Sequence, residues 1–133
     1  MTPKEYLEQY RTLDAEIESK REQIGRITAI ATKVSPSSDG LSFSGDVSDR
    51  VGKAAAKLVD LEKEIATDIE KLASLKAEIR TQISAIHLSA YRYILEEHYF
   101  NFKSFDAIGE KIGYSRMQIC RMHGTALTYI TPP

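Results

Sequence analysis

The chain has 133 residues, of which 42% are hydrophobic and 28% charged, and its formal net charge is −1. This length allows one modest core, or a long helical element joined to a small globule, and excludes two large domains. The nearly neutral charge excludes a general attraction to polyanions, so any nucleic-acid site must be local.

The composition also offers little for metal or disulfide chemistry. Cys120 is the single cysteine, and the three histidines are too scattered for the spacing of zinc ligands. We therefore expect no metal site and no cofactor. The first residues lack the apolar run of a signal peptide, and no apolar run reaches the roughly 18 residues of a membrane span, which predicts a cytoplasmic protein.

The first predicted element is a long helix that begins at Thr2-Pro3. Thr2 can cap it, Pro3 suits the first helical position, and Glu5 can close a capping box. Apolar residues recur about every 3.5 positions, as in a coiled coil, with a polar gap at Lys20. Ser35-Pro36 should end the helix. The stripe consists of Tyr6, Tyr10, Leu13, Ile17, Ile24, Ile27, Ala31 and Val34.

Residues 35–47 hold five serines and two glycines without helical periodicity, which predicts a loop in which only Leu41 and Phe43 could dock on a helix. A second long helix should follow, capped by Ser48 or Asp49. Its stripe, again with a repeat of about 3.5 residues, is Val51, Ala55, Leu58, Leu61, Ile65, Ile69, Leu72, Leu75, Ile79, Ile83 and Ile86. Because such stripes must be covered, the two helices should form a coiled-coil arm that pairs either within the chain or between chains.

The pattern changes near residue 88, which divides the chain into a helical arm (1–87) and a C-terminal module (88–133). Ser89 is predicted to cap a shorter helix, and the stretch "NFKS" at 101–104 should interrupt it. One face of this helix would carry Tyr91, Ile94, Leu95 and Tyr99. The aromatic residues between 91 and 105 are predicted to be core residues and not a platform for stacking bases.

Two short helices around a glycine come next. Ser104 can cap a helix over 105–112, which Gly113 can end in the left-handed conformation. Ser115 can cap the following helix, and Gln118 can complete its capping box. We expect Ile108, Ile112, Tyr114, Ile119 and Met122 where the helices touch, with Gly109 allowing close approach. The predicted fold is therefore all-α: a long two-helix coiled-coil arm followed by a small tri-helical helix-turn-helix module.

The outer face of the last helix suggests DNA recognition. From Gly113 to Leu127 there are two arginines and no acid, so this stretch is locally positive. With the helix in the major groove, Arg116 and Arg121 would meet base edges, where an arginine can form two hydrogen bonds with guanine. The predicted DNA-binding residues are Ser115, Arg116, Met117, Gln118, Cys120, Arg121, Ser104 and Lys103.

A family resemblance supports this interpretation. The segment "YRYILEEHYFNFKSFDAIGEKIGYSRMQICRMHGTAL", about a third of the chain, resembles region 4 of bacterial sigma-70-type factors, which reads the upstream promoter element. The whole layout is similar to small phage proteins of Gram-positive hosts, among them the ArpU-like and RinA-like late-gene transcriptional regulators. Met117 and Cys120 stand where sigma factors commonly carry an acidic and a basic residue, so the promoter element is not carried over.

The leading hypothesis is thus a phage or prophage transcriptional regulator that binds double-stranded DNA, with an arm that forms a homodimer or reaches RNA polymerase. One alternative is a small terminase-type packaging protein that forms a ring, and another is an adaptor that binds proteins but no DNA. No phosphate-binding loop or nucleophile–base pair is found, so we do not expect an enzyme. His123 is predicted to be a phosphate contact or a surface residue, and His98 a half-buried packing residue.

Overall fold

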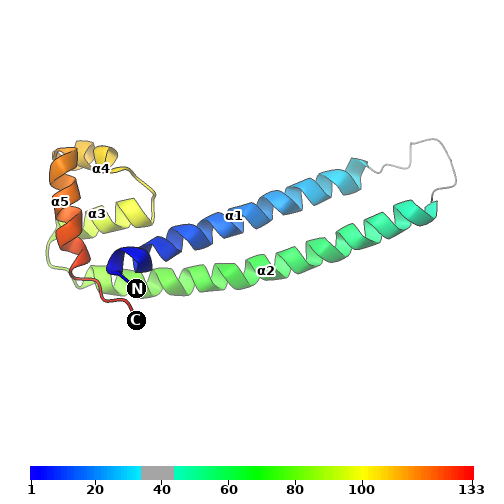
Figure 1. The fold of residues 1–133 in the computed structure, drawn as a ribbon, viewed down its shortest axis with the longest axis horizontal. Coiled ribbons are helices and arrows are strands. Elements are labelled where there is room, and N and C mark those ends of the chain that lie inside the picture. The colour runs from blue at the N-terminus through cyan, green and yellow to red at the C-terminus, as the bar shows by residue number, and fades with distance from the viewer. Residues whose placement is uncertain (34–43) are drawn as a thin grey trace. The chain divides into compact units, whose positions relative to one another are not determined.

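The computed structural model describes residues 1–33 and 44–133, with side chains placed up to residue 31 and from residue 49. These residues form an all-α fold, as predicted. The helices are α1 (Pro3–Lys33), α2 (Ser44–Ser84), α3 (Ser89–Tyr99), α4 (Phe105–Ile112) and α5 (Arg116–Leu127) (Figure 1). The predictions for Val34, Leu41 and Phe43 lie outside the described residues.

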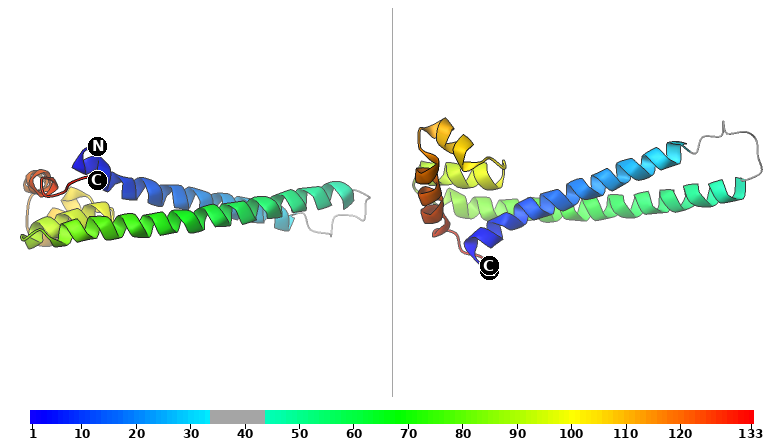
Figure 2. Two further views of the ribbon diagram at one scale, coloured as in Figure 1. Left: turned by 90° about the horizontal axis from the view of Figure 1, so that it is seen from below. Right: turned by 45° about the horizontal axis from the view of Figure 1, so that its top comes forward.

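The described residues group into two compact units. Unit 1 contains Met1–Asp14 and Lys71–Pro133, and unit 2 contains Ala15–Glu70. This grouping differs from the predicted division at residue 88, because the first turns of α1 and the last turns of α2 share a hydrophobic core with the C-terminal helices. The two ends of the chain lie near each other in unit 1 (Figure 2).

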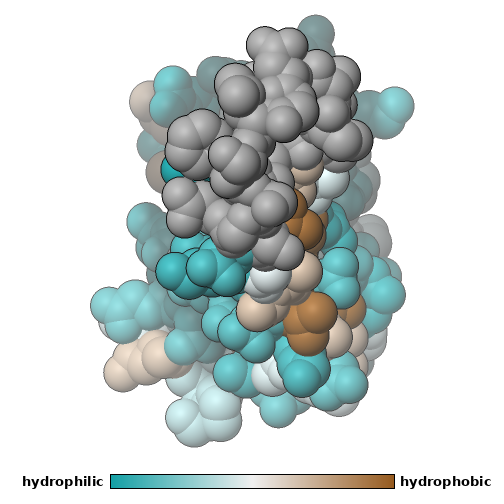
Figure 3. Space-filling view, turned by 90° about the vertical axis from the view of Figure 1, so that its right-hand side faces the viewer, coloured by the Kyte–Doolittle hydropathy of each residue, from teal (hydrophilic) through white to brown (hydrophobic). Residues whose placement is uncertain are grey.

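In unit 2, α1 and α2 pair in antiparallel orientation within the chain. Lys20, the polar gap in the predicted stripe, places its Nζ 2.5 Å from Oδ2 of Asp68 and 3.6 Å from Oε2 of Glu64. Its hydrogen bond to Asp68 is the main cause of a raised pKa of Lys20. Ile17 and Leu61 of the same unit are buried. Figure 3 shows the end of the molecule where the described part of α1 ends and α2 begins, with a few apolar residues among hydrophilic ones.

The beginning and the stripe of α2 differ from prediction. The helix starts at Ser44, so residues 44–47 are helical and Ser48 and Asp49 are not its caps. Serine and aspartate are favoured at helix starts, and one glycine costs only about 1 kcal/mol, so the loop composition was misleading there. Val51, Ala55 and Ile69 face solvent, whereas Asp68 is buried. A straight helix of 3.6 residues per turn drifts from a strict 3.5-residue repeat, which explains the change of face.

The core of unit 1 joins the base of the helix pair to α3, α5 and the C-terminal tail. The predicted capping box of α1 is present: the Thr2 amide donates to Glu5 Oε2 (3.0 Å), and the Glu5 amide donates to Thr2 Oγ1 (3.1 Å). Leu7 is fully buried, although the predicted stripe passed over it. The buried residues of this core are Tyr6, Leu7, Tyr10, Ile79, Ile83, Ile86, Leu95, Tyr99, Phe100, Ala126 and Ile130.

The predicted cap of α3 is wrong. Leu88, not Ser89, occupies the N-cap position, and no side chain caps this helix. Ser89 already lies inside the first turn, one residue past the position from which a hydroxyl reaches the free amides. The turn before α3 is held instead by Arg92, whose Nη1 donates to the carbonyls of Ile86 (2.5 Å) and His87 (3.1 Å). Across the described part of the chain, no helix combines the length and apolar character needed to cross a membrane.

Candidate nucleic-acid interface

Helices α4 and α5 form the predicted pair of short helices around a tight turn. Ser104 caps α4 by accepting a hydrogen bond from the Ala107 amide (3.1 Å). Gly113 ends α4 with a φ of 82°, a left-handed conformation that favours glycine. The amides of Gly113 and Tyr114 both donate to the Gly109 carbonyl, at 2.8 and 2.9 Å. The chain therefore reverses within three residues, as the sequence indicated.

Gly109 lies in close contact with the turn and with α5. A Cβ atom at this position would overlap the carbonyl oxygen of Tyr114 and lie 3.2 Å from Cγ1 of Ile119. The predicted role of Gly109 is thus confirmed. The prediction for the Tyr114 side chain is wrong, because this ring is 41% exposed. The backbone of Tyr114, and not its ring, fills the space above Gly109.

A second small core fixes the orientation of α5. Ile94 of α3, Ile108 of α4 and Ile119 of α5 are each at most 1% exposed and pack together. Partly buried side chains surround them: Tyr93, Phe105, Ile112 and Met122. Because all three helices contribute to one core, the opposite face of α5 is held toward solvent.

The N-terminus of α5 is closed by the predicted capping box. Ser115 Oγ accepts from the Gln118 amide (3.2 Å), and Gln118 Oε1 accepts from the Ser115 amide (2.8 Å). Both residues are predicted to bind DNA, but their side-chain oxygens accept hydrogen bonds from backbone amides at the start of α5. The side-chain NH2 group of Gln118 and the hydroxyl hydrogen of Ser115 remain available as donors to a phosphate. The first turn of α5 also carries the positive end of the helix dipole.

Four of the predicted DNA-binding residues form the exposed face of α5: Arg116, Met117, Cys120 and Arg121. Arg121 Nη2 lies 3.6 Å from Sδ of Met117. Arg116 Nη1 lies 3.9 Å from Oδ2 of Asp106, and both of these side chains are at least 70% exposed. Such a long, exposed ion pair is worth at most about 1 kcal/mol, so both guanidinium groups remain available to a ligand.

The other two predicted residues, Lys103 and Ser104, precede α4. The Lys103 amide donates to the Glu97 carbonyl (2.9 Å), and the Lys103 carbonyl accepts from Nδ1 of His98 (2.8 Å). A carbonyl can only accept, so Nδ1 of His98 carries a proton. His98 is half-buried, as predicted. Hydrogen bonds therefore hold the backbone amide and carbonyl of Lys103, whose side chain is exposed. Arg116 of α5 contacts Asp106 in the first turn of α4, the helix that follows Lys103 and Ser104.

His123 lies inside unit 1, which contradicts its prediction as a surface residue or phosphate contact. It is 7% exposed, and its Nε2 lies 2.6 Å from the Tyr99 hydroxyl. Burial, reinforced by His98 and Lys4, lowers the pKa of His123 to about 4, and burial raises the pKa of Tyr99. The neutral imidazole therefore accepts a hydrogen bond from Tyr99. No local sequence signal marked this pair, since its partners are 24 residues apart.

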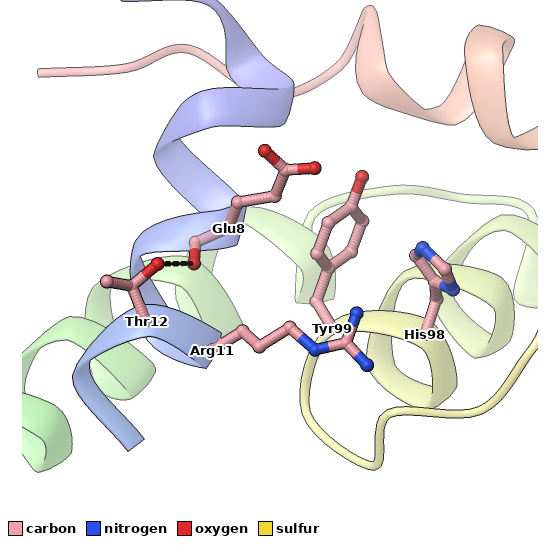
Figure 4. A pocket seen from close by; sticks show the side chains of 5 residues that line it. All are labelled: Glu8, Arg11, Thr12, His98 and Tyr99. Atoms are coloured by element: carbon pink, nitrogen blue, oxygen red, sulfur yellow. Dashed lines mark hydrogen bonds between the residues drawn. The ribbon is translucent and has the colours of Figure 1, made fainter. Parts of the chain in front are cut away.

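A cavity of about 160 Å³ lies at the base of α1, lined by Glu8, Arg11, Thr12, His98 and Tyr99 (Figure 4). The Thr12 hydroxyl donates to the Glu8 carbonyl (3.3 Å), and Arg11 extends toward His98. Sequence patterns did not indicate this cavity, because its walls come from α1 and α3. Among the described residues, no three His, Cys, Asp or Glu side chains are grouped so that they could hold a metal ion.

No protein-family model, curated protein or solved structure matches the chain. The likeness to sigma-70 region 4 therefore stays a prediction.

Proposed function

We propose that this protein binds double-stranded DNA sequence-specifically and reads the major groove with the exposed face of α5. The observation that carries the proposal is the pair of exposed arginines, Arg116 and Arg121, on a helix whose other face is anchored by buried Ile119 and Ala126. A rigid helix that presents arginines at and near its N-terminal turn has the form used for base recognition.

The recognition helix alone offers a small contact area. Helix α5 has 12 residues, and two arginines that each contact guanine would contribute about 1–3 kcal/mol of discrimination apiece. Helix-turn-helix proteins commonly reach useful specificity by binding paired half-sites as dimers. We therefore propose a homodimer, and since α1 and α2 pair within the chain, the second copy would bind an outer surface.

The biological role proposed is regulation of phage or prophage transcription, with RNA polymerase as a further candidate partner. This part rests on the resemblance of residues 91–127 to sigma-70 region 4. A packaging protein of the small terminase type would use the same helix but assemble into a ring. Mass measurement by light scattering at several concentrations separates a dimer from a ring.

The test is selection of fragments bound from the native genome, followed by affinity measurements on the selected site. Replacing Arg116 or Arg121 with alanine should weaken specific binding by about 1–3 kcal/mol each. Arg50→Ala, which removes an exposed arginine from unit 2, is the matched control and should leave affinity nearly unchanged. Enrichment upstream of a block of structural genes supports a regulator.

Two results would oppose the proposal. If the wild-type protein fails to bind any duplex at low salt, where phosphate contacts are strongest, the adaptor alternative is correct. If the alanine variants bind the selected site as tightly as the wild type does, α5 is not the recognition helix.

A further inference from the structure

Unit 1 contains a second cluster of cations, which belong to α1 and α2 and not to α5. Arg11 of α1 and Lys76 and Arg80 of α2 lie over three aromatic rings, Tyr10, Phe100 and Phe102. We call these six residues the basic-aromatic patch. All of them belong to unit 1, which also contains the helix-turn-helix.

The rings form one connected group. The centroids of Tyr10 and Phe100 are 5.0 Å apart in an edge-to-face arrangement, and those of Tyr10 and Phe102 are 6.2 Å apart. Phe102 is 37% exposed and has a φ of 57°, a left-handed conformation that is unusual for a residue with a side chain. The loop before α4 thus holds an aromatic ring at the surface, beside Arg11, in an uncommon backbone conformation.

The cations sit over the ring faces. The Arg11 guanidinium lies 5.3 Å from the Phe102 centroid, and the Arg80 guanidinium lies 5.8 Å from that of Phe100. Lys76 Nζ lies 5.2 Å from the Phe100 centroid and 5.8 Å from that of Tyr10. Significant contacts of this kind occur about once per 70–80 residues, so four at one place are a concentration.

Within residues 1–31 and 49–133, no ion pair neutralises the positive charge of this patch. Among the described residues, no carboxylate oxygen lies within 4 Å of the side-chain nitrogens of Arg11, Lys76 or Arg80. Glu8 and Asp14 are on the same helix as Arg11, three residues to either side, and reduce the local potential without pairing. Arg11 also borders the cavity shown in Figure 4, which leaves open space beside its guanidinium.

The patch adjoins the part of the module that should face a DNA strand. In helix-turn-helix complexes the first helix crosses the sugar-phosphate backbone. Here that helix is α4, and the chain leads into it from Phe102 through the exposed Lys103 to Ser104. Phe102, which lies under the Arg11 guanidinium, is two residues before the Ser104 cap, so one edge of the patch lies next to the helix that should cross the backbone.

We propose that the basic-aromatic patch is a second, sequence-independent contact for the phosphate backbone of DNA, which extends the footprint beyond α5. This inference rests on the proposed function, because it assumes that DNA is the ligand. The cations, held over the rings, are ordered before binding and bind phosphates without reading bases.

The test compares two triple variants that each remove three positive charges. The patch variant, Arg11→Gln/Lys76→Met/Arg80→Gln, removes the three cations of the patch but keeps its rings and much of the apolar part of each substituted side chain. The control variant, Arg50→Gln/Lys53→Met/Lys57→Gln, removes three exposed cations of unit 2. Affinity for the selected site and for a scrambled duplex is measured between about 50 and 200 mM salt. The slope of log K against log salt is negative, and each lost phosphate contact makes it shallower by about 0.9.

The proposal predicts that the patch variant loses about 2–3 units of this slope on both duplexes, while the ratio of specific to scrambled affinity stays the same. The control variant should keep the wild-type slope. Because the patch variant keeps Arg116 and Arg121, its sequence preference should persist, so this result is independent of the test of α5.

Three outcomes would overturn the inference. If the patch variant keeps the wild-type slope while Arg116→Ala still lowers specificity, DNA binding stands and the patch is not part of it. If its thermal midpoint falls but its slope does not, the rings and cations serve only to stabilise unit 1. If it binds DNA as the wild type does but has lost affinity for poly-glutamate, the patch binds an acidic protein.

Discussion

Gly109→Ala should damage the helix-turn-helix from the inside. The added Cβ would overlap the Tyr114 carbonyl oxygen and press on Ile119 Cγ1, at 3.2 Å. The carbonyl belongs to the backbone of the turn and cannot rotate away, so α5 must move relative to α4. Overpacking of this kind costs typically 1–3 kcal/mol, whereas alanine regains about 1 kcal/mol of helix propensity. We expect a net loss of up to about 2 kcal/mol, which is about 1–3 kcal/mol below the stability that the propensity gain alone would give.

Gly124→Ala provides the matched control, because a Cβ at residue 124 meets nothing within 4 Å. This exposed position in α5 should gain about 0.5–1 kcal/mol from the same propensity difference. Urea unfolding followed by circular dichroism measures both variants. Gly109→Ala should be about 1–3 kcal/mol less stable than Gly124→Ala, and it should also weaken DNA binding. A Gly109→Ala protein that gains as much stability as Gly124→Ala would refute the close contact at Gly109.

Other perturbations test the remaining parts of the structure. The pKa of His123 is lowered to about 4 in the folded protein, so between pH 6.5 and 4 only the unfolded state takes up this proton. The free energy of unfolding should therefore fall by up to about 3 kcal/mol across this range. An NMR titration in which the His123 ring protonates near pH 6.5 would contradict this. Ser115→Ala should cost about 1 kcal/mol by removing the cap of α5, whereas Ser89→Ala, which removes no cap, should change stability by less than about 0.5 kcal/mol. In unit 2, Lys20→Ala should lower the urea midpoint more than Asp68→Ala does. The Asp68 carboxylate is the more buried partner (11% against 25% exposed), and Lys20→Ala would leave it without a counter-charge. Equal effects would show that the pair is fully hydrated.

Local signals predicted the parts of the fold that depend on local chemistry. The bounds of α4, the left-handed Gly113 and the capping box of Ser115 and Gln118 are all as predicted. Each depends on residues within a few positions of one another, since a cap or a turn is completed by its own neighbours. The exposed face of α5 was also predictable, because the helical repeat fixes which residues lie opposite the buried Ile119.

Packing between distant segments could not be predicted in this way. The partner of His123 is Tyr99 on another helix, and burial of an imidazole has no signature in the surrounding sequence. The pairing of Lys20 with Asp68 joins residues 48 positions apart, although the polar gap at Lys20 did mark the place. The cations of the basic-aromatic patch likewise come from two helices and meet their rings only in the folded chain.

The proposal that α5 reads DNA is tested most directly by competition binding on the genome-selected duplex and on a scrambled duplex of the same composition. At about 150 mM salt, the wild type should prefer the selected duplex, and Arg116→Ala with Arg121→Ala should reduce that preference by about 2–6 kcal/mol in total while leaving the affinity for the scrambled duplex largely intact. An equal loss on both duplexes, or no loss on either, would show that these two arginines do not read base sequence.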